Sequence, residues 1–296
     1  MLGKLLKHEW KSTYRTGCLM LIVLVGITFL GWLAFRSPMW QTLYGDNDYY
    51  RNNFGINILN LVSVFTLILY FVMLVAVPIG TMAYLGVRFY KTMYTDEGYL
   101  THTLPVKEGQ LMFCKTLISS LWVLIISVGV VLSVFGLMLF LISAVLPPDY
   151  TLAEFWEEFR QVYETEMREV FAMIEKELGI SFRGYFIYMI VSMVLSAFAS
   201  IMTLFGAISM GQLFTKHRVL MAIVSYILVK IVSGIIGSAV EGIITVSYAK
   251  STSESMTAIG SYFNTNMIVV LVLNLIFAAL LYLVSWLVNT RRLNLE

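Results

Sequence analysis

Lys230 is the clearest candidate for a functional residue in this sequence, because it is a charged residue inside a long apolar run. An ionisable residue within a membrane span is costly and marks a candidate ion or substrate path. Residues four apart, or nearly so, extend its helical face: Tyr226, Gly234, Ser238 and Glu241. Ser192, Ser196 and Ser200 repeat this spacing in the preceding apolar run. Such stripes predict either close helix packing with hydrogen bonds across the contact, or the wall of a substrate path.

No motif of a familiar catalytic site accompanies these residues. The sequence has no phosphate-binding glycine loop and no G-x-S-x-G, and "HEWKS" at His8 lacks the second histidine of a zinc protease. The cysteines and histidines are scattered, at Cys18, Cys114, His8, His102 and His217, so we expect no metal site and no disulfide framework. We expect a chain that is not an enzyme and binds no cofactor of its own. Any energy for work would come from ions or from another chain.

The composition places these residues in a membrane protein. Hydrophobic residues make up 59% of the 296 positions and charged residues only 13%. About 20 mostly apolar residues cross a bilayer as a helix. We predict an all-α, polytopic membrane fold, a single transmembrane domain over 1–296. Its six transmembrane helices lie at about 17–35, 56–87, 116–146, 184–214, 219–240 and 267–288.

Lysine and arginine predict the orientation of the six spans. An even number of spans puts both termini on one side, together with the connections after the second and fourth spans. That side holds 12 of the 20 basic residues but 5 of the 18 acidic ones, and the rest of the chain holds 8 and 13. Basic residues concentrate on the cytoplasmic side of membrane proteins. Both termini are therefore predicted to be cytoplasmic.

Three further segments carry predictions of their own. In residues 1–15, Leu2, Leu6 and Trp10 recur every four positions and the lysines take other faces. This pattern predicts an interfacial helix on the cytoplasmic surface or, alternatively, a positive flank of the first span. Residues 147–183 form an extracellular helical insertion with nine of the 18 acids and an apolar stripe at helical spacing. That stripe needs a partner: the rest of the insertion, a second copy or a substrate. Residues 241–266 are half polar, which predicts a short re-entrant or surface segment on the outer face.

The cytoplasmic segment 88–115 is the one compact charged stretch between two long apolar runs. Thr95, Asp96 and Gly98 favour a turn or a helix cap, and the proline of Leu104-Pro105 interrupts any continuous helix. We predict a short surface helix at about 96–104. It would expose Tyr99 and its neighbour Leu100 beside acidic residues, as a docking knob for another protein. The alternative is a solvated loop that merely turns the chain.

The stretch "DEGYLTHTLPVKEGQLMFCK" at 96–115 resembles the first cytoplasmic loop of ABC-2-type transporter permeases of Gram-positive bacteria. The opening "LLKHEWK" and the ending "TRRLNLE" are similar to the same group. In that family the loop is a coupling helix that fits a cleft on a separate ATP-binding cassette ATPase. The resemblance implies that this contact is made by Asp96, Glu97, Gly98, Tyr99, Leu100 and Thr101. The insertion at 147–183 is larger than the family's usual outer loop.

The resemblance also implies the partners. Two permease chains, identical or paralogous, would assemble with two ATPase subunits that hold ATP and Mg. We expect a multi-pass permease of the bacterial cytoplasmic membrane that contacts membrane lipid, binds no nucleic acid and exports an amphipathic peptide or lipid-like substrate. Two alternatives stay open: a non-transporting receptor or scaffold with an acidic extracellular helical module, and an ion-coupled secondary transporter that uses Lys230.

Overall fold

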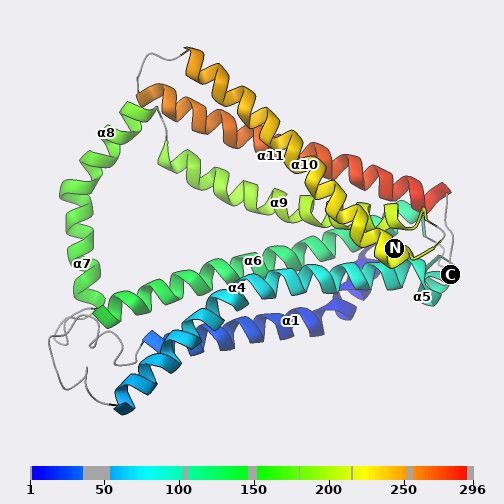
Figure 1. Cartoon of the computed structure of the whole chain (residues 1–296), viewed down its shortest axis with the longest axis horizontal. Coiled ribbons are helices and arrows are strands. Elements are labelled where there is room, and N and C mark those ends of the chain that lie inside the picture. The colour runs from blue at the N-terminus through cyan, green and yellow to red at the C-terminus, as the bar shows by residue number, and fades with distance from the viewer. Residues whose placement is uncertain are drawn as a thin grey trace. The chain divides into compact units, whose positions relative to one another are not determined.

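In a computed structural model of the chain, the described residues are helical almost throughout (Figure 1). The structure describes residues 2–35, 54–102, 106–145, 152–179, 181–214, 216–251 and 256–291. The all-α prediction is confirmed. In chain order the helices are α1 (Leu2–Phe35), α4 (Phe54–Tyr94), α5 (Asp96–His102), α6 (Glu108–Val145), α7 (Leu152–Val162), the π-helix η1 (Tyr163–Met167), α8 (Arg168–Leu178), α9 (Phe182–Gly211), α10 (Arg218–Ser251) and α11 (Met256–Arg291).

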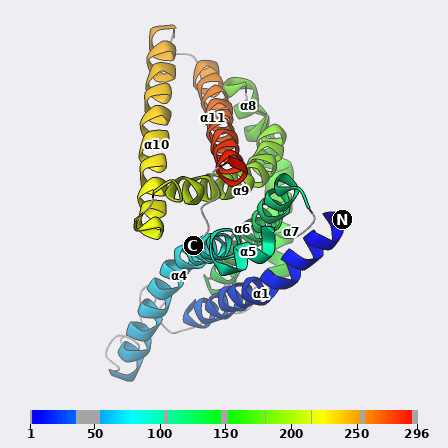
Figure 2. The same ribbon diagram turned by 90° about the vertical axis from the view of Figure 1, so that its right-hand side faces the viewer.

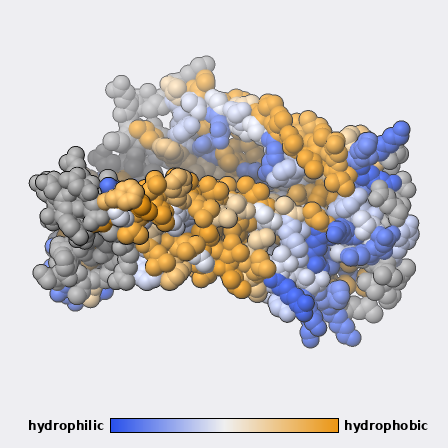
Figure 3. All heavy atoms as spheres, turned by 60° about the horizontal axis from the view of Figure 1, so that its bottom comes forward, coloured by the Kyte–Doolittle hydropathy of each residue, from blue (hydrophilic) through white to orange (hydrophobic). Residues whose placement is uncertain are grey.

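Six of these helices are long and apolar enough to cross a membrane: α1, α4, α6, α9, α10 and α11. The number of spans agrees with the prediction. Large hydrophobic side chains are exposed along all six helices, as expected where the surrounding solvent is lipid. On the face drawn in Figure 3, hydrophobic and hydrophilic residues occupy separate patches. These features are those of a multi-pass membrane protein.

Several helices run further than the predicted spans. Residues 2–15, predicted as a separate interfacial helix, continue without a break into α1. Residues 241–251 continue α10 and 256–266 begin α11, where a re-entrant or surface segment was predicted. The hydroxyl groups there bond within the helix: Thr245 and Ser247 donate to the carbonyls of Glu241 and Ile243. Tyrosines then join the two helix ends: Tyr262 bonds to Thr245 at 3.0 Å, and Tyr248 bonds to Thr265 at 2.9 Å.

The chain divides into two compact units. Unit 1 contains the described parts of Met1–Trp10, Ala83–Leu124 and Glu166–Glu296, and unit 2 those of Lys11–Met82 and Ile125–Thr165. In unit 1, α9 packs against α10 and α11 (Figure 2). The closest approaches use glycines, since a Cβ added at Gly206 would lie 2.6 Å from Leu281 Cβ. A Cβ at Gly211 would lie 2.5 Å from the backbone of Ala222.

Unit 2 is held together by small and hydroxyl residues of α1, α4 and α6. Ser133 on α6 bonds to Thr28 of α1 at 2.6 Å and to the Tyr70 hydroxyl of α4 at 3.0 Å. Gly31 lies against Leu137 and Tyr70, so a Cβ there would come within 3.2 Å of the Leu137 side chain. Small residues and hydroxyls are typical of close contacts between membrane helices.

The amphipathic helices predicted in the insertion at 147–183 are present as α7 and α8, with η1 between them. The rings of Phe155, Trp156 and Phe159 contact one another along one side of α7. α8 ends at Gly179, which adopts the left-handed conformation (φ 63°) that favours glycine at a helix end. α8 packs on α11 of the same unit.

Candidate functional site

The short helix α5 is the best candidate site, and it occupies much of the range predicted for a surface helix. The Thr95 carbonyl accepts from the Gly98 amide at 2.6 Å, which closes the first turn. Asp96 and Glu97 stand in that first turn, where carboxylates complement the helix dipole. Both acids are exposed, Gly98 is buried, and the Tyr99 side chain is 50% exposed. The backbones of Leu100 and Thr101 belong to α5, but their side chains and Leu104-Pro105 lie outside the described residues.

Tyr94, two residues before α5, is anchored in a buried hydrogen-bond network. Its side chain is 1% exposed, and its hydroxyl donates to Asn289 Oδ1 of α11 at 2.6 Å. Ser209 of α9 lies 2.8 Å from the same hydroxyl and 2.6 Å from Ser285 Oγ. Asn289 Nδ2 in turn donates to the sulfur of Met112 in α6 at 3.2 Å. Tyr94 therefore bonds the end of α4 to α9 and α11, and Asn289 extends the network to α6.

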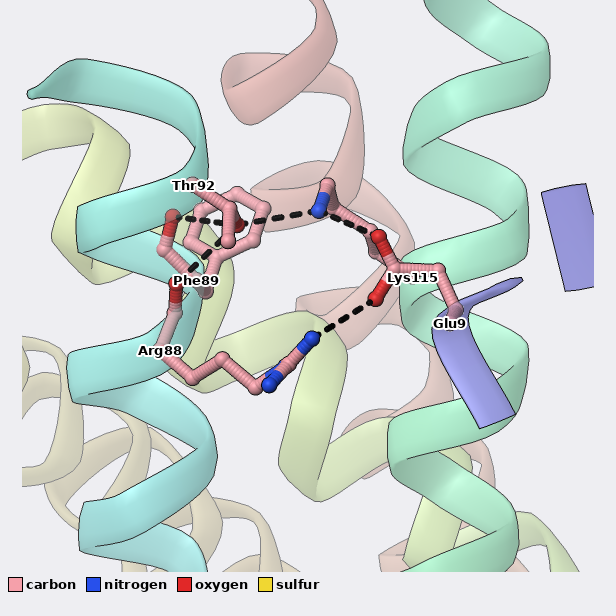
Figure 4. A network of polar contacts seen from close by, with 5 residues as sticks. All are labelled: Glu9, Arg88, Phe89, Thr92 and Lys115. Carbon is pink, nitrogen blue, oxygen red and sulfur yellow. Dashed lines mark hydrogen bonds and ion pairs between the residues drawn. The ribbon is translucent and has the colours of Figure 1, made fainter. Parts of the chain in front are cut away.

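A charged cluster lies close to this network in the sequence and also connects several helices (Figure 4). Lys115 Nζ of α6 donates to Glu9 Oε1 of α1 at 2.6 Å and to Thr92 Oγ1 of α4 at 2.9 Å. Arg88 lies 3.6 Å from the other Glu9 oxygen. The Lys115 side chain is 5% exposed and that of Glu9 11%. This pair is costly to break from the side of Glu9, because Lys115 would then be a buried cation without the carboxylate that it faces.

Stacked rings reinforce the same region of unit 1. Phe89 of α4 lies parallel to Phe205 of α9, with ring centroids 3.8 Å apart. Trp10 of α1 stacks on Trp122 of α6 at 5.0 Å. Together with the polar bonds, these contacts join α1, α4, α6, α9 and α11. The helices on either side of α5, α4 and α6, are therefore bonded to several other spans.

The stripes predicted on α9 and α10 are not part of this region. Lys230, Gly234, Ser238 and Glu241 are all exposed, and Tyr226 is half-buried. Ser196 is exposed, while Ser192 and Ser200 are half-buried. Ser192, Ser196 and Ser238 donate to carbonyls of their own helices. Nothing lies within 4 Å of a Cβ built on Gly234, so no described helix packs closely on this glycine.

The sequence predicts the short helix α5 but not the residues that bond α4 and α6, on either side of it, to other helices. Glu9, Arg88 and Lys115 entered only as charges that set the orientation, and Tyr94, Ser209, Ser285 and Asn289 were not singled out. One signal was present: Asn289 and Lys115 are polar residues at the ends of apolar runs. Asn289 bonds to Tyr94, and Lys115 bonds to Glu9. Each pair is more than 100 positions apart in the sequence, and residue spacing in one sequence cannot show such a contact.

Among the described residues, no group of three or more histidine, cysteine or acidic side chains lies close enough to hold a metal ion. The chain matches no family model, no curated protein and no solved structure.

Proposed function

We propose that this chain is the membrane-spanning permease subunit of an ABC transporter and has no ATPase activity of its own. The observation that supports this proposal is the contrast between the exposed helix α5 and the buried residue just before it, Tyr94. Asp96, Glu97 and Tyr99 are exposed on a short helix, while Tyr94 just before it is buried and bonded to other helices. The resemblance of residues 96–115 to the first cytoplasmic loop of ABC-2-type permeases supports the same assignment.

In this proposal both termini and α5 face the cytoplasm, and the membrane is the bacterial cytoplasmic membrane. The excess of lysine and arginine on that side supports the orientation: 12 basic against 5 acidic residues. α7 and α8 then lie on the outer side. Two permease chains, identical or paralogous, assemble with two ATP-binding cassette subunits.

The proposed mechanism rests on the bonds that join the helices on either side of α5 to other spans. The ATPase subunits bind ATP with Mg and close, and the closure displaces α5, which sits in a cleft on their surface. Because Tyr94 and Lys115 tie the flanking helices to α1, α9 and α11, the displacement moves spans rather than bending a free loop. The spans alternate between inward- and outward-facing states and export an amphipathic peptide or a lipid-like molecule.

The test is purification of the chain in a mild detergent from its native host, followed by identification of the proteins that accompany it. The proposal predicts an ATP-binding cassette protein at one copy per permease, and ATP hydrolysis by the complex. A chain that purifies alone, or only with an extracellular protein, would contradict the proposal.

A second candidate function has its own support in α7 and α8. Trp156 and Phe159 are exposed on α7 among glutamates, as expected of a surface that binds another protein. A non-transporting receptor or scaffold would retain an extracellular partner through this surface and would not need the ATPase. Disruption of α5 would then leave its activity unchanged, whereas the transporter proposal requires a loss.

A further inference from the structure

The other described helices of unit 1 do not cover the face of α10 that carries Lys230. Within unit 1, α9 and α11 pack on α10, whose buried residues are Ala222 and Ser225. Lys230 points to another side, together with the exposed Ile227, Ile231 and Gly234. Because nothing lies within 4 Å of a Cβ built at Gly234, there is room beside the lysine for a group from outside the unit.

Lys230 lies too deep in the span to reach water easily. It follows Arg218 by 12 positions, which is about 18 Å along a helix, past the midpoint of a hydrocarbon core about 30 Å thick. A lysine stem extends by only about 6 Å. The ammonium would therefore stay well inside the core, where an uncompensated charge is unfavourable.

The described residues do little to compensate the charge of Lys230. Lys230 makes no ion pair or hydrogen bond through its ammonium there, and its Nζ lies 5.8 Å from the centre of the Tyr226 ring, the outer limit of a cation–π contact. Glu241 on the same face is 11 residues away, about 16 Å along the axis, so it cannot pair with Lys230 within one helix.

A second copy of the chain would not compensate the charge of Lys230. If two such faces met around a two-fold axis, each Lys230 would face its equivalent, and like charges repel. A pair of facing lysines instead creates a positive site that an anion would fill. The apolar residues Ile227 and Ile231 beside the lysine would at the same time accept a hydrocarbon chain.

We propose that Lys230, with the Tyr226 ring beside it, binds the anionic headgroup of an amphiphile that enters the span, with its apolar part along the face of α10 that unit 1 leaves uncovered. This inference deepens the proposed function, on which it rests for its role in transport, by giving the exported molecule a negative charge. The chemistry that Lys230 recognises is a phosphate or carboxylate carried by a lipid-like molecule. Gly234 leaves the space for that headgroup.

Binding is tested on the purified full chain, without any ATPase, in nanodiscs of phosphatidylcholine or of equimolar phosphatidylcholine and phosphatidylglycerol. Native mass spectrometry counts the lipids retained on release. We expect retained phosphatidylglycerol on the wild type, a several-fold loss in Lys230→Gln, and recovery in Lys230→Arg. Gly234→Leu, which keeps the charge but fills the space, should also lose the lipid. Lys176→Gln on α8 is the control for loss of one exposed cation and should retain it.

Inorganic phosphate added to phosphatidylcholine nanodiscs separates a lipid-borne anion from a free one. If free phosphate binds and phosphatidylglycerol does not, the amphiphile proposal is overturned. Equal retention by wild type, Lys230→Gln and Gly234→Leu would also overturn it. Because no ATPase is present, this result is independent of the co-purification test. Retention without a co-purifying ATPase would reject the transporter proposal and leave the anion site standing.

Discussion

Lys115 Nζ of α6 lies 2.6 Å from Glu9 Oε1 of α1, and both side chains are largely buried. Arg88 of α4 faces the second oxygen of the same carboxylate at 3.6 Å. One carboxylate thus holds two cations from two other helices at the base of the segment that carries α5. This junction and the Tyr94 network bond the helices on either side of α5 to other helices of unit 1.

Removing Glu9 should destabilise the fold more than removing Lys115. Glu9→Gln leaves two cations without the carboxylate they face, whereas Lys115→Met leaves Glu9 with Arg88. Breaking a buried pair costs about 3–5 kcal/mol of unfolding free energy, and replacing both partners by apolar residues costs much less. We expect Glu9→Gln to have the lowest stability in detergent, Lys115→Met an intermediate one, and Glu9→Met with Lys115→Met to recover part of the loss.

The measurement is denaturant unfolding in detergent, followed by tryptophan fluorescence. Trp10 and Trp122 stack on each other at the contact of α1 and α6, and they contribute to the signal together with the other four tryptophans. Equal stability of the two single variants would show that the carboxylate does not serve both cations.

Tyr94→Phe should weaken the junction of α4, α9 and α11. The change removes the donor to Asn289 Oδ1 and leaves that oxygen, which is almost fully buried, without its partner. An unsatisfied buried group costs about 1–3 kcal/mol. Tyr84→Phe on the same helix is the matched control, because the Tyr84 hydroxyl makes no hydrogen bond within the described residues. The same unfolding assay decides: equal midpoints for the two variants would contradict the role given to Tyr94.

Gly206→Val should disrupt the packing of α9 on α11. A Cβ at this position would meet the Leu281 carbonyl oxygen at 2.7 Å and its Cβ at 2.6 Å, so backbone as well as side chain must move. Overpacking of this kind costs about 1–3 kcal/mol or more. Gly237→Val is the control, since nothing lies within 4 Å of a Cβ there. Size-exclusion chromatography after heating should show a loss of thermal stability for Gly206→Val alone. An equal loss in both variants would contradict a close contact of α9 with α11 at Gly206.

Tyr99→Ala and Glu97→Lys should reduce the amount of co-purifying ATPase several-fold and leave the spans folded. Both changes alter the exposed face of α5. Glu97 also interacts electrostatically with Lys115, so Tyr99→Ala is the cleaner of the two variants. Tyr163→Ala and Glu157→Lys are the controls: they change residues of comparable exposure in η1 and α7, and Tyr163 is 44% exposed against 50% for Tyr99. Unchanged co-purification in the two α5 variants would remove the docking proposal.

The helices were predictable because apolar runs of this length have few other structures in a lipid environment. The short helix at 96–102 was predictable from its turn formers and from the proline that follows. Helix ends were predicted less well. Glu241 and the hydroxyl residues around it suggested a surface segment, yet serine and threonine bond to their own helix carbonyls and let α10 and α11 continue.

The supports of the candidate site were not predictable in the same way. A hydrogen bond such as Tyr94 to Asn289 depends on which faces of two distant helices meet, and one sequence gives the period of a helix but not its neighbour. For Lys230 the sequence left two alternatives, helix packing and a substrate path. In the structure the lysine stands on the exposed side of α10.

The most direct test of the central claim is photocrosslinking in the native host from a photoreactive amino acid at position 99, with position 163 as the matched site. The account predicts that position 99 crosslinks to an ATP-binding cassette ATPase and that position 163 does not. A crosslink from position 99 to some other protein, or to none while the protein is folded in the membrane, would contradict the assignment of α5 as the ATPase docking site.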